Sequence, residues 1–122
     1  MAYLRKPGKR LFQLDLFGKK YDVRLAPDGH EVFEAGENER VWGITVLEDR
    51  TMYLNASGTP EQRHTTLLHE VQHLIEEHYC LDHMDRCTTE AESEARTDKI
   101  SLGWLYFMRS NRHAVDYIRG GA

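Results

Sequence analysis

The spacing of apolar residues changes halfway along the chain, and this change limits the folds that the chain can adopt. Before Ser57-Gly58, apolar residues alternate with polar ones, which is the pattern of a strand with one buried face. After it, they recur every three or four residues, as on the buried side of an amphipathic helix. Because neither half can bury its apolar face alone, we expect residues 1–122 to form one α+β domain.

The first half is expected to form a small sheet, antiparallel or mixed. Gly18-Lys19-Lys20 is a plausible turn between two alternating segments and predicts a hairpin. The stretch 26–40 contains Pro27, Gly29 and Gly36 together with many acidic residues, and it predicts a loop with one short strand. The expected strands are residues 10–17, 21–25, 31–33, 41–47 and 51–55.

The second half is expected to hold two long helices and a short one, because helix-capping signals precede its apolar stretches. Thr59 and Gln62 form a capping box, and Pro60 takes the first helical position. Thr89 and Glu92 form a second capping box. The predicted fold is therefore a sheet packed on two long helices, with a short C-terminal helix. The expected helices are residues 60–79, 90–109 and 111–119.

One stripe of the first long helix is expected to face the sheet. It consists of Leu67, Val71, Leu74 and His78, so His78 is predicted to be partly buried. Several large residues elsewhere are most simply interpreted as core. They are Trp42, Trp104, Tyr106, Phe107 and Met108.

The same helix carries the pattern HEVQH at residues 69–73. Histidines four residues apart lie on one helical face, so the imidazoles of His69 and His73 can reach one Zn²⁺, while Glu70 is turned toward the water that such a metal binds. Composition alone predicts about 0.04 occurrences of this pattern in the chain. The alternative is a pair of surface histidines without a metal. Both side chains leave the helix away from its apolar stripe, which favours the metal site.

A catalytic zinc site normally has three protein ligands, and the second long helix offers the third. Glu94 and Asp98 lie one turn apart on a shared face, so Glu94 can bind the metal while Asp98 accepts the free ring N–H of a ligand histidine. Glu90 lies on nearly the same face and is the main rival, whereas Glu92 points away. The alternative is a solvated first turn whose carboxylates favour the positive end of the helix dipole.

HEVQH, followed by Glu94 and Asp98 on a second helix, resembles the gluzincin group of zinc metallopeptidases. The strand at 51–55, the short loop and the helix sequence TLLHEVQH are also similar to that group. Among its compact members, the ImmA/IrrE-type metallopeptidases of bacteria, phages and other mobile elements are the most similar. The resemblance covers residues 41–108. It implies a hydrolase with one zinc ion held by the two histidines and Glu94.

The expected activity is hydrolysis of peptide bonds in a protein or peptide substrate. Glu70 would act as general base, taking a proton from a water that Zn²⁺ activates and passing it to the leaving amine. The strand at 51–55 is expected to be an edge that pairs with an extended substrate. The alternative function is a catalytically inactive binding or regulatory protein of the same fold. Candidates for the group that stabilises the oxyanion are Tyr53, His83, His113 and Tyr117.

Composition excludes other classes of function. The net charge of −4 and the pI near 6.0 argue against a nucleic-acid partner. No apolar run approaches the roughly 20 residues that span a bilayer, and the basic start of the chain lacks the apolar core of a secretory signal. A cytoplasmic protein is therefore expected, with a regulatory protein as a further candidate partner.

A second zinc site is not expected. The residues available for one have spacings unlike the paired ligands of structural zinc sites. The two cysteines are therefore interpreted as reduced thiols. The residues concerned are His78, Cys80, His83 and Cys87.

Overall fold

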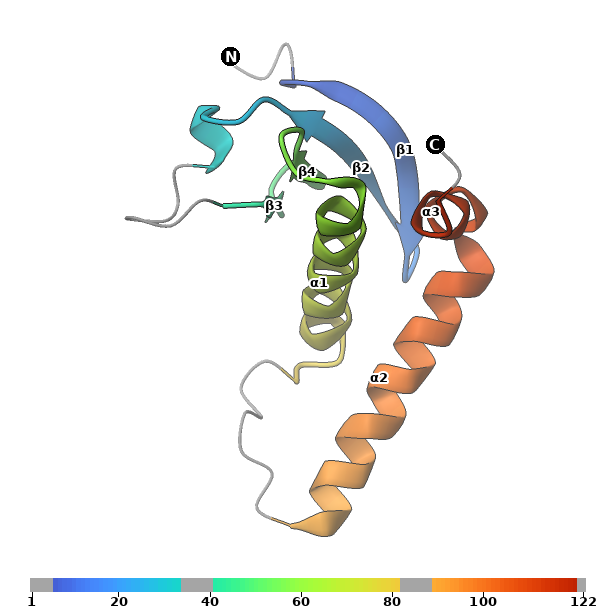
Figure 1. Ribbon diagram of the computed structural model, residues 1–122. Coiled ribbons are helices and arrows are strands. Elements are labelled where there is room, and N and C mark those ends of the chain that lie inside the picture. Colours follow the sequence, from blue (N-terminus) through green and yellow to red (C-terminus); the bar gives the residue numbers. More distant parts are fainter. Residues whose placement is uncertain (1–5, 34–40, 82–88, 121–122) are drawn as a thin grey trace.

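The predicted α+β class is confirmed by the computed structural model of the chain, which describes residues 6–33, 41–81 and 89–120. A four-stranded sheet formed by the first half packs against three helices from the second half (Figure 1). The strands are β1 (Lys9–Leu16), β2 (Lys19–Ala26), β3 (Gly43–Val46) and β4 (Thr51–Asn55). The helices are α1 (Pro60–His78), α2 (Glu90–Ser110), α3 (Arg112–Ile118) and the short 3-10 helix η2 (Glu31–Phe33).

The sheet is mixed, with the strand order β1-β2-β4-β3. Strand β4 pairs in parallel with β2 and antiparallel with β3, so both of its sides are occupied. The prediction that residues 51–55 form an edge is therefore wrong. Met52 and Leu54 face the helices while Tyr53 is buried on the opposite face, and a strand that is apolar on both faces belongs in the interior of a sheet. The edge beside β4 is β3.

The hairpin between β1 and β2 turns one residue earlier than predicted. Leu16 pairs with Lys19, which leaves Phe17 and Gly18 as the two central residues of the turn. Both have positive φ, 54° for Phe17 and 79° for Gly18. Two-residue hairpin turns favour this backbone because its twist matches that of the strands, and glycine adopts it without a steric penalty.

Residues 31–33 form η2 instead of the predicted short strand. The Val32 N–H donates to Nδ1 of His30 at 3.1 Å, and the Phe33 N–H donates to the His30 carbonyl at 2.9 Å. These local bonds satisfy the backbone without a partner strand, which explains the difference. Phe33 still becomes buried, under the face of the sheet that carries Tyr53.

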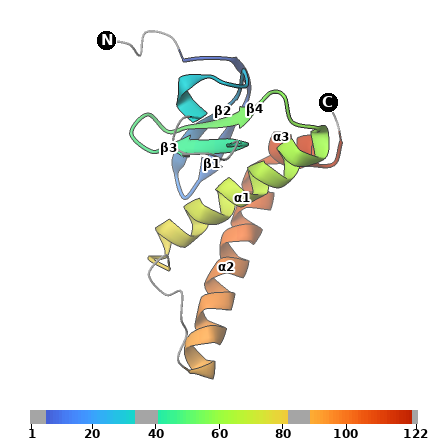
Figure 2. The same ribbon diagram turned by 60° about the vertical axis from the view of Figure 1, so that its left-hand side comes forward.

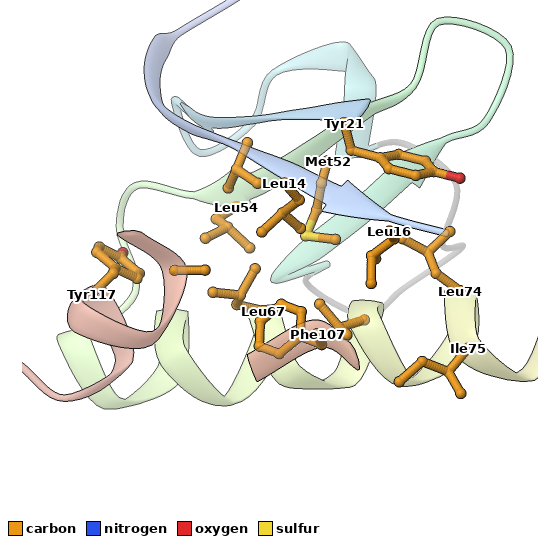
Figure 3. Close-up of a cluster of buried hydrophobic side chains, with 13 residues drawn as sticks. Leu14, Leu16, Tyr21, Met52, Leu54, Leu67, Leu74, Ile75, Phe107 and Tyr117 are labelled. Atoms are coloured by element: carbon orange, nitrogen blue, oxygen red, sulfur yellow. The ribbon is translucent and has the colours of Figure 1, made fainter. Parts of the chain in front are cut away.

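The main core lies between the sheet and α1, as Figure 3 shows. The predicted helix stripe is confirmed for Leu67, Val71 and Leu74, which are buried against residues of β1 and β4. His78 is instead exposed at the end of the stripe, where its ring stacks on Phe17 with centroids 3.6 Å apart. The predicted capping box at the start of α1 is present with both of its hydrogen bonds.

Helix α2 is attached to this core mainly through its C-terminal half. Gly103 and Phe107 are buried, and the indole N–H of Trp104 donates to Oε1 of Gln72 on α1 at 2.7 Å. Tyr106 and Met108, together with Leu102 and Leu105, are exposed, so the prediction of Tyr106 and Met108 as core is wrong. Figures 1 and 2 both show the N-terminal half of α2 projecting away from the sheet. Among the described helices, none combines the length and the apolar content that crossing a bilayer requires.

Candidate metal centre

The middle of α1 brings His69, Glu70 and His73 together as one side-chain cluster. One ligand atom from each lies within 4.8 Å of the others, and among the described residues this is the one group of three or more histidine, cysteine or acidic side chains that meets this condition. The Nε2 atoms of His69 and His73 are 3.0 Å apart. Two nitrogens bound tetrahedrally to one zinc ion lie about 3.3 Å apart. The donor set and its spacing therefore fit a zinc ion.

The three side chains of this cluster differ in their exposure to solvent. Both histidine side chains are exposed, with 61% for His73, so their lone pairs are accessible to an ion from solvent. Glu70 is half-buried beneath β3. The predicted orientation of the motif, with both histidines away from the apolar stripe, is confirmed.

The edge strand β3 holds the carboxylate of Glu70. The Thr45 hydroxyl donates a hydrogen bond to Oε1 of Glu70 at 2.8 Å. Gly43 lies two residues earlier on the same face of β3, and a Cβ there would collide with the methyl group of Thr66 on α1. The absence of a side chain at Gly43 lets β3 approach α1 closely enough for Thr45 to reach Glu70.

A second carboxylate of the same helix lies beside His73. Nδ1 of His73 lies 3.4 Å from Oε1 of Glu76, and Oε2 of Glu76 pairs with Nη2 of Arg96 on α2 at 2.6 Å. Metal-binding histidines commonly donate their other ring N–H to such a carboxylate. The sequence analysis assigned this role to Asp98, which stays a prediction, and did not consider Glu76, although its i,i+3 spacing from His73 is visible in the sequence.

The acidic residues predicted on α2 lie outside the cluster. Glu90, Glu94 and Asp98 are all exposed. Arg96 faces α1, where it also donates to the Leu81 carbonyl at 2.8 Å. Glu94 and Asp98 each lie two residues from Arg96, about 200° around the helix, and so leave α2 on another side. The structure therefore does not bring Glu94 to the histidines, and its role as third ligand stays a prediction.

The residues proposed to stabilise an oxyanion are placed elsewhere. Tyr53 is buried on the opposite face of the sheet, where burial and then the charge of Asp49 raise the pKa of its hydroxyl. The Tyr117 hydroxyl accepts a hydrogen bond from Nε of Arg63 at 3.3 Å, within the packing of α3 against α1. His113 is exposed on α3. His83 lies outside the described residues.

The described members of the disfavoured second zinc site are separated from the HEVQH cluster by at least one turn of α1. His78 stacks on Phe17, and Cys80 is exposed in a left-handed backbone conformation with φ of 57°. His83 and Cys87 lie outside the described residues.

Comparison of the chain with models of protein families, with curated proteins and with solved structures finds no match. The resemblance to gluzincins therefore rests on the motif and its spacing. The physical case for a function rests on the cluster formed by His69, Glu70 and His73, and on the groups that orient it.

Proposed function

We propose that this protein is a zinc-dependent metallopeptidase. The observation that carries the proposal is the 3.0 Å separation of the His69 and His73 Nε2 atoms, with a carboxylate of Glu70 in the same cluster. Two imidazoles and a nearby carboxylate are the ligand pair and the general base of zinc metallopeptidases with this motif. The gluzincin-like spacing in the sequence is the sole support for Glu94 as the third ligand, because Glu94 lies outside the cluster in the structure.

Different residues of the chain would have different roles in the reaction. His69 and His73 would hold the ion, and the Glu76 carboxylate, 3.4 Å from Nδ1 of His73, would orient that ring. The bound Zn²⁺ would supply Lewis acidity and make a water molecule nucleophilic at neutral pH. Glu70 would accept the proton of that water and deliver it to the leaving amine. The hydrogen bond from Thr45 leaves the second oxygen of Glu70 free for this transfer.

The position of β3 supports an extended peptide as substrate. It is the last strand of the described sheet next to β4, and its Thr45 contacts the general base directly. A peptide that paired with the open side of β3 would gain backbone hydrogen bonds and bring its own carbonyls toward the cluster on α1. This role replaces the one predicted for residues 51–55.

The proposal is tested by measuring zinc content and peptide cleavage on the same variants. Zinc analysis of the purified full-length chain should give about one ion per chain, and His73→Ala should lose it. Incubation of the zinc-loaded protein with a proteome-derived peptide mixture, followed by mass spectrometry, should reveal new cleavage products. Glu70→Gln should keep zinc but lower the cleavage rate by about 100-fold or more.

The matched control is Glu77→Gln, which makes the same change at an exposed position of α1 outside the cluster. It should keep both zinc and activity. Cleavage by Glu70→Gln at the wild-type rate would contradict the enzymatic function. Stoichiometric zinc without cleavage of any peptide would favour the alternative, a binding or regulatory protein that uses the metal centre structurally.

A further inference from the structure

The side of α2 that is turned away from α1 carries a row of exposed side chains. Two large apolar residues lie at its centre, Leu102 and Leu105, which are 57% and 40% exposed. Asp98 lies one turn before them and Arg109 one turn after them, and both are exposed. At about 100° per residue these four side chains lie within about 60° of arc, roughly opposite the buried Phe107. We call the four residues the outer row of α2.

The spacing of the outer row is that of a helix that packs along another helix. Its members are separated by four, three and four residues, so they recur every 3.5 residues or so, as the inward-facing positions of a coiled coil do. Helix α2 packs on α1, β1 and α3 with its other sides. Among the described helices and strands, none therefore covers this row (Figure 1).

The two other large apolar residues that α2 exposes lie outside the outer row. The Tyr106 ring stacks on Phe17 of the β1-β2 turn, with centroids 5.2 Å apart, so it already has a partner within the chain. Met108 is 55% exposed and leaves the helix about 90° from the centre of the row. Leu102 and Leu105 are therefore the apolar centre of this surface.

The outer row is complementary to itself when two copies of α2 pack antiparallel. With a twofold axis between Leu102 and Leu105, each leucine of one copy lies opposite the other leucine of the second copy. Asp98 and Arg109 are equally far from that axis, so they face each other at both ends of the row. A twofold interface has this reciprocal form. A parallel pair would instead bring Asp98 against Asp98 and Arg109 against Arg109, and like charges disfavour it.

The charges around the outer row favour the same arrangement. The N-terminal half of α2 exposes Glu90 and Glu94 besides Asp98, and Arg112 is exposed just beyond Arg109. Antiparallel packing brings the acidic half of each copy near the basic end of the other. Among the residues that the structure describes, neither Asp98 nor Arg109 has an ion-pair partner, so both charges are available to a second copy.

We propose that the outer row of α2 is the interface of a homodimer, in which two copies of this chain pack antiparallel and form two ion pairs between Asp98 and Arg109. Asp98 then pairs with an arginine of the second copy instead of with a ligand histidine. Residues 98–109 span about 16 Å of helix, which is short for a stable interface, so we expect a dissociation constant on the order of 10–100 μM. The inference does not depend on the proposed metal centre.

The test measures the mass of the full-length chain in solution as a function of its concentration. Sedimentation equilibrium between about 5 and 500 μM should show the mass rising from 14.3 kDa toward twice that value. Circular dichroism of each variant below checks that it keeps the wild-type helix content.

A matched pair of variants assigns the dimer to the outer row. Leu102→Asn and Met108→Asn make similar changes at positions of α2 that are almost equally exposed. Leu102→Asn should weaken dimerisation by about tenfold or more, because each dimer loses two buried leucine side chains. Met108→Asn should leave the dissociation constant unchanged, because its position lies outside the row.

A charge swap tests the antiparallel register. Asp98→Arg opposes Arg109 with a like charge at both ends of the row and should weaken dimerisation by about tenfold or more. Combining Asp98→Arg with Arg109→Asp in one chain restores opposite charges at both ends. This double variant should therefore recover the wild-type dissociation constant.

Three results would contradict the proposal. A wild-type chain that stays monomeric up to about 500 μM has no such interface. A dimer that Leu102→Asn leaves unchanged forms through another surface. Loss of the dimer in Asp98→Arg without recovery in the double variant, or no loss in Asp98→Arg, would overturn the antiparallel pairing. None of these measurements depends on zinc binding or cleavage, so the proposed function is tested separately.

Discussion

Helices α1 and α2 carry the two halves of the predicted zinc site, yet they are packed very differently. Helix α1 buries Leu67, Val71, Leu74 and Ile75 along most of its length. Helix α2 buries two residues, Gly103 and Phe107, both in its C-terminal half. The candidate ligands on α1 therefore lie on a helix that a continuous core holds in place. The part of α2 near Glu94 is positioned by a few polar contacts.

Among the described residues, Arg96 makes the polar contacts between the N-terminal half of α2 and the C-terminal part of α1 with the segment that follows it. Arg96 bonds to Glu76 at 2.6 Å and to the Leu81 carbonyl at 2.8 Å, and Glu76 in turn contacts His73. One carboxylate therefore contacts both α2 and a candidate ligand histidine. If the proposed metal centre binds zinc, changes at Arg96 or Glu76 should weaken that binding although neither residue is a proposed ligand.

The largest effect is expected where α2 joins the core. Phe107→Ala should lower the free energy of unfolding by about 3–5 kcal/mol, because it removes a fully buried ring that the neighbouring residues cannot replace. Leu105→Ala, at a position that is 40% exposed on the same helix, should change it by less than about 1 kcal/mol. Urea unfolding measures both. Equal losses would mean that the exposed side of α2 contributes as much to stability as the side that holds Phe107.

The next prediction concerns the third zinc ligand, which the sequence analysis placed on α2. Glu94→Gln should weaken zinc binding by about 100-fold or more if Glu94 completes the site, because an amide is a poorer ligand than a carboxylate. Glu90→Gln, the same change at the rival position, should leave the affinity unchanged. Competition with a chromogenic zinc chelator measures both. A wild-type affinity in Glu94→Gln would show that α2 does not supply the ligand through this residue.

A smaller loss of zinc affinity is expected from the carboxylate that links the helices. Glu76→Gln should weaken zinc binding by about tenfold, because it removes the charged partner of His73 Nδ1. Its neighbour Glu77 is exposed, and Glu77→Gln should have no effect in the same chelator competition. If the two variants bind zinc equally well, Glu76 stabilises the packing of α2 without orienting the ligand.

The smallest effect, on kcat, is expected from the contact between Thr45 of β3 and Glu70 of α1. Thr45→Val should lower kcat for peptide cleavage by several-fold to about tenfold, because Glu70 loses the donor that orients it. Zinc affinity should not change, and Thr45→Ser should restore kcat because it restores the hydroxyl. Steady-state cleavage assays and zinc competition measure the two quantities. A Thr45→Ser variant as slow as Thr45→Val would indicate a packing role.

Local patterns predicted the secondary structure and half of the candidate site. The caps at Thr59 and Thr89 gave the starts of α1 and α2, and strand 51–55 was predicted with its observed bounds. The HEVQH pattern predicted which side of α1 carries the two histidines. These features depend on residues a few positions apart, so a single segment contains the information that determines them.

The wrong predictions share a different origin. Residues 31–33 were predicted as a short strand, but their backbone N–H groups bond within their own segment, at His30. Tyr106 and Met108 are as apolar as core residues, yet only the narrow side of α2 that holds Gly103 and Phe107 meets the core. Composition shows that a residue can be buried, and the available partners decide whether it is.

The sequence by itself determined an α+β domain and a helix that presents two histidines and a glutamate on one side, because helical and strand periodicities are short-range. Only the tertiary structure placed β4 inside the sheet and Thr45 beside Glu70, and only it joined Arg96 to Glu76. Such contacts join residues 20 or 25 positions apart in the chain. They depend on how whole elements pack, which no local pattern encodes.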